Sequence, residues 1–430
     1  MKILVCDDRD AEKVKKSIDE TLTALGIADV EVDVMDATAL VEAFGILKRR
    51  ANAVLLSEPT DEGRPEEPLG FDDTDIVVLD NNLAELDIAG ARLTAESVVG
   101  DVRAFTSAGY LVSVNKRPSV DFDLAYLVGD ARTKADLGLA KRHLRDESLW
   151  RAPLDGEDAR FAPWYWPDLL MEPARRARQI EFVEAALDRP LLPTLGFEAD
   201  RQGRLSEEAI AYIEPDAKKP GGDDSAALVE VTFRDYFRRS ERTLVQADRE
   251  RIEAVSHDAG NRHAAGTARK IMARVIAAEL DLWFRMEVLG PQEVLADLPH
   301  VMARFPFASE EIWKSKVDLT APIVAEEAFI DRSFVDRFVQ SARYEQSGLW
   351  VPRDAYWVGD IEGAEGMRQA TVDLPSSYQF KFCEDTGRFA DIRTVASRSF
   401  VPERGFEWQP LYVAEPESGR QYVPQAFFSL

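Results

Sequence analysis

Residues 75–83, with the sequence DIVVLDNNL, combine a short apolar run with a terminal Asp80 and two asparagines. A run of four to eight apolar residues bounded by polar ones is typical of a buried strand, often in a parallel sheet. The same pattern opens the chain as KILVCDD, which ends in Asp7 and Asp8. In open α/β sheets, ligands bind at the edge where the strands have their carboxyl ends. We therefore expect three carboxylates at one sheet edge, where they require a cation.

The residues around these two runs alternate between helical and strand patterns. Apolar residues at three-to-four spacing predict amphipathic helices over residues 10–25, 36–50, 92–105 and 133–144. Short apolar runs predict further strands at residues 30–34, 110–114 and 124–128. Alternating strands and helices form βαβ units, whose right-handed crossovers build one parallel sheet with helices on both faces. The sequence thus predicts an α/β domain over residues 1–150, with a five-stranded, doubly wound parallel sheet.

The remainder of the chain divides into a connector and a second large domain. Residues 151–225 hold tryptophans among prolines, a predicted helix at 173–187, and a hinge rich in Pro and Gly. Residues 226–430 begin with predicted helices at 248–257 and 267–289 and end in short aromatic runs typical of strands. We therefore predict a C-terminal α+β domain that acts as an effector or interaction module. It contains no Walker loop, HExxH or G-x-S-x-G motif.

The composition argues against a nucleic-acid-binding, disulfide-rich or membrane-spanning protein. The 430 residues carry 78 Asp and Glu against 53 Lys and Arg, a formal charge of −25, which disfavours binding nucleic acid through the whole surface. The two cysteines, Cys6 and Cys383, lie in different halves and form neither a disulfide framework nor a zinc cluster. The chain shows no signal-peptide pattern and no apolar run long enough to span a membrane. We expect a cytoplasmic protein without a membrane association.

The N-terminal third resembles a response-regulator receiver domain, a flavodoxin-like fold. The resemblance rests on the acidic pair after the first strand, the aspartate that ends the third strand, and Gly90 some ten residues later. It implies that Asp80 is phosphorylated from a histidine of a partner kinase or phosphotransfer protein. It also implies that Asp7 and Asp8 help to hold Mg²⁺, with a backbone carbonyl near Asn82 completing the site. Mg²⁺ prefers such oxygen ligands and keeps several waters.

The sequence departs from the receiver pattern at two switch positions. Receivers place Thr or Ser at the end of strand four, where this chain has Asn115, with Ser113 two residues earlier. They place Lys at the end of strand five, and in the predicted fifth strand residues 127–130, LVGD, occupy that position. Lys116 is the nearest candidate to replace it. Without the lysine, phosphoryl oxygens lose a charge-assisted hydrogen bond.

Three functions follow from this pattern. The first is a signalling protein in which phosphorylation of Asp80 controls a C-terminal module that does not bind DNA. The second is a non-phosphorylated pseudo-receiver, an adaptor that binds protein partners in a bacterial regulatory or defence pathway. The third and weakest is a hydrolase or nuclease-like effector that uses His257, Asp258 and His263. Because His257 and His263 are six residues apart and do not share a helix face, a structural role is favoured for them. A homodimer is one option for the assembly.

Overall fold

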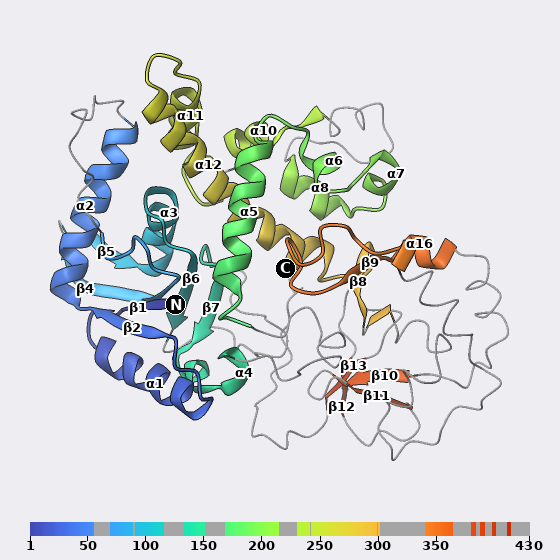
Figure 1. Cartoon of the computed structure of the whole chain (residues 1–430), viewed down its shortest axis with the longest axis horizontal. Helices are drawn as coiled ribbons and strands as arrows, with labels where there is room; N and C mark the ends of the chain where they lie inside the picture. The colour runs from blue at the N-terminus through green and yellow to red at the C-terminus, as the bar shows by residue number, and fades with distance from the viewer. Residues whose placement is uncertain are drawn as a thin grey trace.

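The computed structural model describes residues 1–55, 69–88, 91–115, 133–150, 168–214, 230–240, 242–298, 300–301, 340–363, 380–383, 388–391, 398–400 and 411–413. The chain begins with an α/β unit, blue to cyan in Figure 1, and continues into a helical part beside it. Short strands toward the C-terminus form a separate sheet in the order β11-β10-β13-β12, with bounds Arg388–Asp391, Phe380–Cys383, Leu411–Val413 and Arg398–Phe400.

The α/β unit is built on a five-stranded sheet in the order β2-β1-β3-β6-β7. Its strands are β1 (Lys2–Cys6), β2 (Glu31–Met35), β3 (Ile76–Asp80), β6 (Tyr110–Asn115) and β7 (Leu137–Ala140). Every neighbouring pair is parallel. In chain order of these strands the arrangement is 2-1-3-4-5, the flavodoxin-like order, with its switch point between the first and third strands. The prediction of a five-stranded parallel sheet is confirmed.

Helices cover both faces of this sheet, because its strands are apolar on both sides. Ile3 and Val5 of β1 pack in one cluster with helix α1 (Ala11–Ala24). Leu4 and Cys6 point to the other cluster, which contains helices α2 (Ala37–Leu55) and α3 (Ala95–Phe105). Side chains alternate along a strand, so a continuous apolar run supplies both layers. The doubly wound arrangement and the buried position of Cys6 are therefore confirmed.

Two predictions within the first 150 residues are wrong. Asp80 is followed by a hairpin of β4 (Asn82–Ile88) and β5 (Ala91–Thr94), so helix α3 begins at Ala95 and not at residue 92. The predicted helix at 133–144 is instead strand β7 followed by a 3₁₀ turn, η2 (Lys141–Arg145). Leu137, Ala140 and Leu144 have helical spacing, but Leu137 and Leu139 also alternate as strand residues do. The predicted strand at 124–128 lies outside the described residues.

The α/β unit also includes α4 (Glu147–Trp150), whose Leu149 and Trp150 pack in one cluster with α1. The helical part contains the elements α5 (Glu172–Ala186), α6 (Leu191–Thr194), α7 (Ala199–Gln202), α8 (Glu207–Ile213), α10 (Phe233–Arg239), α11 (Gln246–Ser256), α12 (Arg262–Trp283), β8 (Leu295–Asp297), β9 (Ala355–Trp357) and α16 (Val358–Gly363). Helix α12 continues into a π-helical turn, η4 (Phe284–Val288). The helices predicted at 173–187 and 248–257 are confirmed in type and place, and the helix predicted at 267–289 is confirmed in type but begins at Arg262.

Helices α5 and α12 pack on each other and join the helical part to the sheet. In the view of Figure 1, α5 lies between the sheet and helices α6 and α8. One hydrophobic cluster runs from Val77 and Leu111 of the sheet to Ile276 and Leu280 of α12. Of the predicted connector at 151–225, residues 151–167 and the hinge at 215–225 lie outside the described residues. The two parts that are described share one apolar core.

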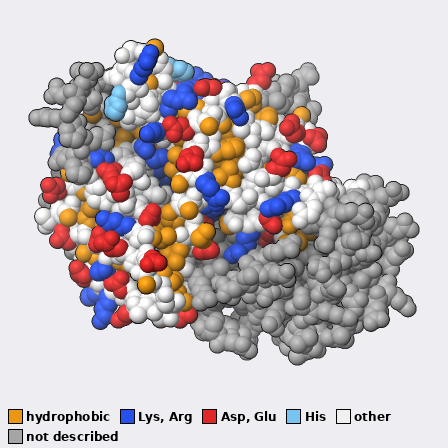
Figure 2. All heavy atoms as spheres, viewed as in Figure 1, with side chains coloured by type: hydrophobic (Ala, Val, Ile, Leu, Met, Phe, Trp, Pro, Cys, Tyr) orange, Lys and Arg blue, Asp and Glu red, His pale blue; other side chains and the backbone are white. Residues whose placement is uncertain are grey.

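The surface in Figure 2 carries acidic and basic side chains side by side over both parts. Among the described residues, no helix is both long enough and apolar enough to cross a membrane.

Candidate metal centre

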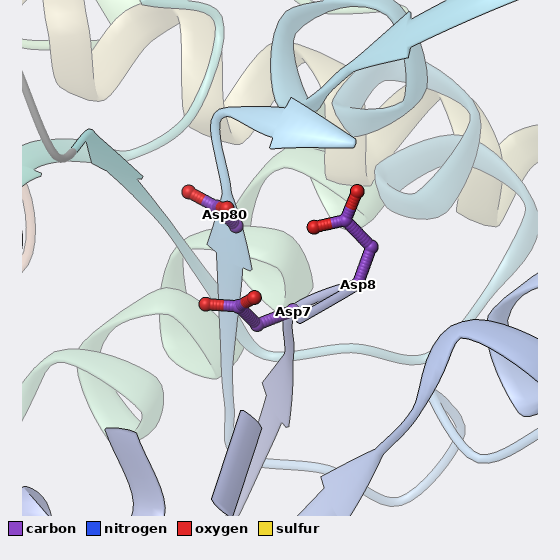
Figure 3. A group of neighbouring side chains, drawn as sticks. All are labelled: Asp7, Asp8 and Asp80. Atoms are coloured by element: carbon purple, nitrogen blue, oxygen red, sulfur yellow. The ribbon is translucent and has the colours of Figure 1, made fainter. Parts of the chain in front are cut away.

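The sheet brings three predicted carboxylates together at its carboxyl edge. Asp7 and Asp8 follow β1 directly, and Asp80 is the last residue of the neighbouring strand β3. One ligand oxygen from each lies within 4.8 Å of the others, as Figure 3 shows for the three side chains. Asp7 and Asp80 are buried, with 3% and 6% of their surface exposed, and Asp8 is half-buried. The group lies at the switch point of the strand order, where α/β sheets bind ligands.

The turn between β1 and α1 holds Asp7 in place. Its Oδ1 atom accepts hydrogen bonds from the backbone N–H groups of Arg9 and Asp10, each at 2.8 Å. This is the local bond that an aspartate makes with the backbone two and three residues further along. These two bonds fix the orientation of the Asp7 carboxylate at the edge of the sheet.

A lysine that the sequence reading had not singled out completes the charge pattern. Lys141 follows strand β7, and its Nζ lies 3.2 Å from Oδ2 of Asp7 and 3.6 Å from Oδ2 of Asp10. Burial raises the pKa of Asp7, but the backbone N–H groups of Asp10 and Arg9 and the Lys141 ammonium outweigh that effect and lower it. Asp7 is therefore ionised at neutral pH.

Lys141 corrects the prediction for strand five. The fifth strand of the described sheet is β7, so the residue that follows it is Lys141, whereas residues 127–130 lie outside the described residues. The signal in the sequence is the basic pair in AKR, residues 140–142, directly after a short apolar run. Because a helix was predicted over residues 133–144, the end of the strand at Ala140 was not recognised, and Lys141 was not predicted as a site residue.

The carboxylates suit a divalent cation. Asp7, Asp8 and Asp80 offer three carboxylate oxygens within 4.8 Å of one another, and oxygen is the ligand atom that Mg²⁺ takes in proteins. These three residues would hold such an ion at this edge of the sheet, with water molecules as its other ligands.

The other predicted site residues are not part of the group formed by Asp7, Asp8 and Asp80. Asn82 begins β4, two residues after Asp80, and its side chain is exposed. Ser113 is buried on β6, in register with Leu79 of β3, and Asn115 ends β6 opposite Ala140. Ser113 and Asn115 therefore both lie on β6, the strand next to β3. Lys116 lies outside the described residues.

The structure does not assemble His257, Asp258 and His263 into a metal group within the part of the chain that it describes. His257 is the C-cap of α11, and its Nε2 lies 3.0 Å from Oε1 of Glu253. Asp258 accepts hydrogen bonds from the backbone N–H groups of Gly260 and Asn261 in the turn. His263 is exposed in the first turn of α12. These contacts are those of residues that end and start helices.

Comparison of the chain with models of protein families, with curated proteins and with solved structures found no match.

Proposed function

We propose that this chain is a signalling protein whose Asp80 accepts a phosphoryl group with Mg²⁺ at the carboxyl edge of the sheet. A histidine kinase or phosphotransfer protein is the proposed donor. The observation that carries the proposal is the convergence of Asp7, Asp8 and Asp80 within 4.8 Å at the switch point of the strand order. Lys141 at the end of the fifth strand supports it, because the receiver pattern also has a lysine there.

The residues divide the chemistry between them. Asp7, Asp8 and Asp80, with a backbone carbonyl near Asn82, would hold Mg²⁺, which screens the charge of the attacking carboxylate and of the incoming phosphoryl group. A carboxylate oxygen of Asp80 then forms a bond to phosphorus, while the bond from phosphorus to the donor imidazole nitrogen breaks. The imidazole leaves with the electron pair and takes a proton, and Asp80 becomes an acyl phosphate. Lys141 is 3.2 Å from Asp7 and would donate to a phosphoryl oxygen.

The test is phosphorylation of the whole chain by a small phosphoramidate in the presence of Mg²⁺, followed by intact mass. We expect the wild type to gain one phosphate and Asp80→Asn to gain none. Asp36→Asn is the matched control: Asp36 follows β2 at the same edge but is exposed and caps α2 through the N–H of Ala39. Its variant should be phosphorylated like the wild type. Absence of phosphate on the wild type at saturating Mg²⁺ would refute the proposal.

A second candidate function is the adaptor that binds partners without phosphorylation. The observation that favours it is Asn115, which ends β6 where the receiver pattern has a hydroxyl residue. An amide at this position cannot reproduce the hydroxyl hydrogen bond to a phosphoryl oxygen with the same geometry. The phosphorylation test separates the two functions, since an adaptor of this kind gains no phosphate in any variant.

A further inference from the structure

We propose that strand β7 couples the acidic site to the helical part of the chain, with Lys141 at one end of the strand and Asp136 at the other. This coupling rests on the proposed function only for its trigger, which is phosphorylation of Asp80 or metal binding. The contacts at both ends of β7 are present in the structure. Both Lys141 and Asp136 would act as positioning residues.

At the carboxyl end of β7, the tie runs to the acidic site. Ala140 is the last strand residue, so the backbone of Lys141 follows its position, and the Lys141 ammonium lies 3.2 Å from Asp7. A phosphoryl group on Asp80 attracts this ammonium, and a divalent cation on Asp7 repels it. Either event changes the restraint on this end of the strand.

At the amino end of β7, the tie runs to the helices. The carboxylate of Asp136, immediately before Leu137, accepts hydrogen bonds from the N–H of Leu111 at 2.7 Å and from Arg103 at 2.8 Å. It also accepts one from Arg176 of helix α5 at 2.9 Å. The side chains of Asp136, Arg103 and Arg176 are 2%, 7% and 4% exposed. One carboxylate thus joins β6, α3 and α5 through side chains that are almost fully buried.

The ionic contacts continue from α5 into α12. Arg176 lies 3.4 Å from Asp281 of α12, which also pairs with Arg175 and, at 3.1 Å, with Arg285. Arg285, in the π-helical turn, donates to the hydroxyl of Tyr110 at 3.3 Å, and Tyr110 begins β6. The amino ends of β6 and β7 therefore contact α5 through Arg176 and the turn after α12 through Arg285.

Strand β7 is short and paired along its length with β6. A shift of the backbone at Lys141 is therefore expected to move the backbone at Asp136. Its residues pair with β6 from Val112 and Leu137 to Asn115 and Ala140. Leu137, Leu139 and Ala140 are buried in the apolar layers. Close-packed interiors shift between discrete arrangements and do not deform continuously. A displacement at Lys141 is thus transmitted over four residues to the carboxylate that Arg176 binds.

The first experiment is amide hydrogen exchange on the full chain, comparing wild type with Lys141→Met. We expect faster exchange, by roughly 2- to 30-fold for a coupling of ordinary size, in the α5 segment that contains Arg176. Amides of the central strand β3 report the loss of global stability, so the increase in α5 should exceed the increase in β3. The matched control is Lys16→Met, because Lys16 is exposed and pairs with Glu20 within helix α1 at 3.8 Å. Exchange in α5 that is unchanged in Lys141→Met, or changed equally in Lys16→Met, would overturn the proposal.

The second experiment reads the coupling in the opposite direction, since coupling free energies are reciprocal. Asp136→Asn keeps the shape of the side chain and weakens the pair with Arg176. We expect altered exchange of the amides of Arg9 and Asp10, which donate to Asp7. Arg234→Gln is the control, because it breaks a partly buried pair with Asp188 inside the helical part. Equal exchange in Asp136→Asn and wild type would overturn the coupling.

Neither experiment requires phosphorylation, so the two proposals fail separately. A wild type that takes up no phosphate refutes the phosphoacceptor function, whereas unchanged exchange in Lys141→Met and Asp136→Asn refutes the coupling. Phosphorylation of the wild type should in addition change exchange in the α5 segment, and Asp136→Asn should abolish that change. Persistence of the change in Asp136→Asn would count against β7 as the route.

Discussion

The ion pair of Asp7 and Lys141 makes a stability prediction at the scale of single residues. Asp7 has a lowered pKa in the folded protein, so its contribution to stability is present above its unfolded pKa of about 3.9 and is lost as pH falls through the folded pKa. Lys141→Met should lower the free energy of unfolding at pH 7 by about 1–2 kcal/mol. The lysine side chain is only 26% exposed, so solvent screens the pair incompletely.

Urea unfolding of wild type and Lys141→Met at pH 7 and near pH 2 measures this effect. The difference at pH 7 should shrink at low pH, because the stability that Asp7 contributes is lost as pH falls through its lowered folded pKa. Added Mg²⁺ should narrow the difference at pH 7 if the ion replaces the lost ammonium charge. An equal difference at both pH values would show that Lys141 acts through packing and not through Asp7.

A site residue could be predicted from the sequence where the strand that precedes it could be recognised. Asp7, Asp8 and Asp80 end apolar runs that are strands under any reading, and the parallel pairing of β1 and β3 brings them together. Lys141 was missed because its strand was read as part of a helix. Contacts between side chains far apart in the sequence, such as Arg176 with Asp136, have no local signal at all.

At the scale of elements, Asp281 is the main ionic link between α12 and α5. Burial raises its pKa, but Arg175, Arg285 and Arg176 outweigh burial and hold it well below its usual range. Removal of one partner from a buried ionic cluster leaves the others uncompensated and typically costs about 3–5 kcal/mol. We therefore expect Asp281→Asn to lower the free energy of unfolding by about that amount at pH 7.

Chemical denaturation of Asp281→Asn beside Asp188→Asn tests this prediction. Asp188 pairs with Arg234, but its side chain is 65% exposed, so we expect its variant to differ little from wild type. Because the pKa of Asp281 is well below its usual range in the folded protein, its contribution should decline progressively as pH falls below about 3.9, the unfolded pKa. Similar losses in both variants would argue that the buried cluster does not hold the helices together.

Helix α3 approaches the helical part so closely that one position accepts only glycine. A Cβ atom at Gly100 would lie 2.6 Å from the backbone oxygen of Thr243. Gly100→Ala should therefore force the two segments apart and cost about 1–3 kcal/mol. Gly266 is the control within a helix: a Cβ there meets no atom within 4 Å, and Ala should stabilise α12 by about 1 kcal/mol.

Thermal unfolding of Gly100→Ala and Gly266→Ala gives the comparison directly. Opposite shifts in Tm are expected, downward for Gly100→Ala and upward for Gly266→Ala. A neutral Gly100→Ala would mean that the Thr243 segment moves away from α3 at little cost.

The type of an element could be predicted where the apolar residues had a clear helical or strand periodicity. The prediction was wrong where a short segment fitted both periodicities. Helices α1, α5 and α12 show long helical spacing, and each was predicted in place. Strand β7 spans four residues, LGLA, and its neighbours fit a helix equally well. The β4–β5 hairpin was missed because Asp87 to Gly90 reads as a loop without showing that its flanks pair. Tertiary pairing decided both cases.

At the scale of the whole molecule, charge is distributed unevenly between surface and interior. The chain has a formal charge of −25, yet arginines hold the contact between the sheet and helices α5 and α12. Arginine suits this role, since its planar guanidinium is always ionised and donates to several carboxylates at once. Excess negative charge keeps the surface soluble, while the buried arginines neutralise the acids enclosed between the two parts.

The shared core predicts that the sheet and helices α5 and α12 unfold together. Val77 of β3 and Ile276 of α12 belong to one hydrophobic cluster, and Asp136, Arg176 and Asp281 link the same parts by buried ion pairs. Separating the parts would expose apolar surface and leave buried charges unpaired, which costs several kcal/mol. Native-state hydrogen exchange in low denaturant measures the opening free energy of each element. We expect values for β3 and α12 within about 1 kcal/mol of each other and an equal decrease of both in Asp281→Asn. If α12 opened at a much lower free energy than β3, the helical part would be a separate folding unit, and coupling through β7 would lack the rigid contact that it requires.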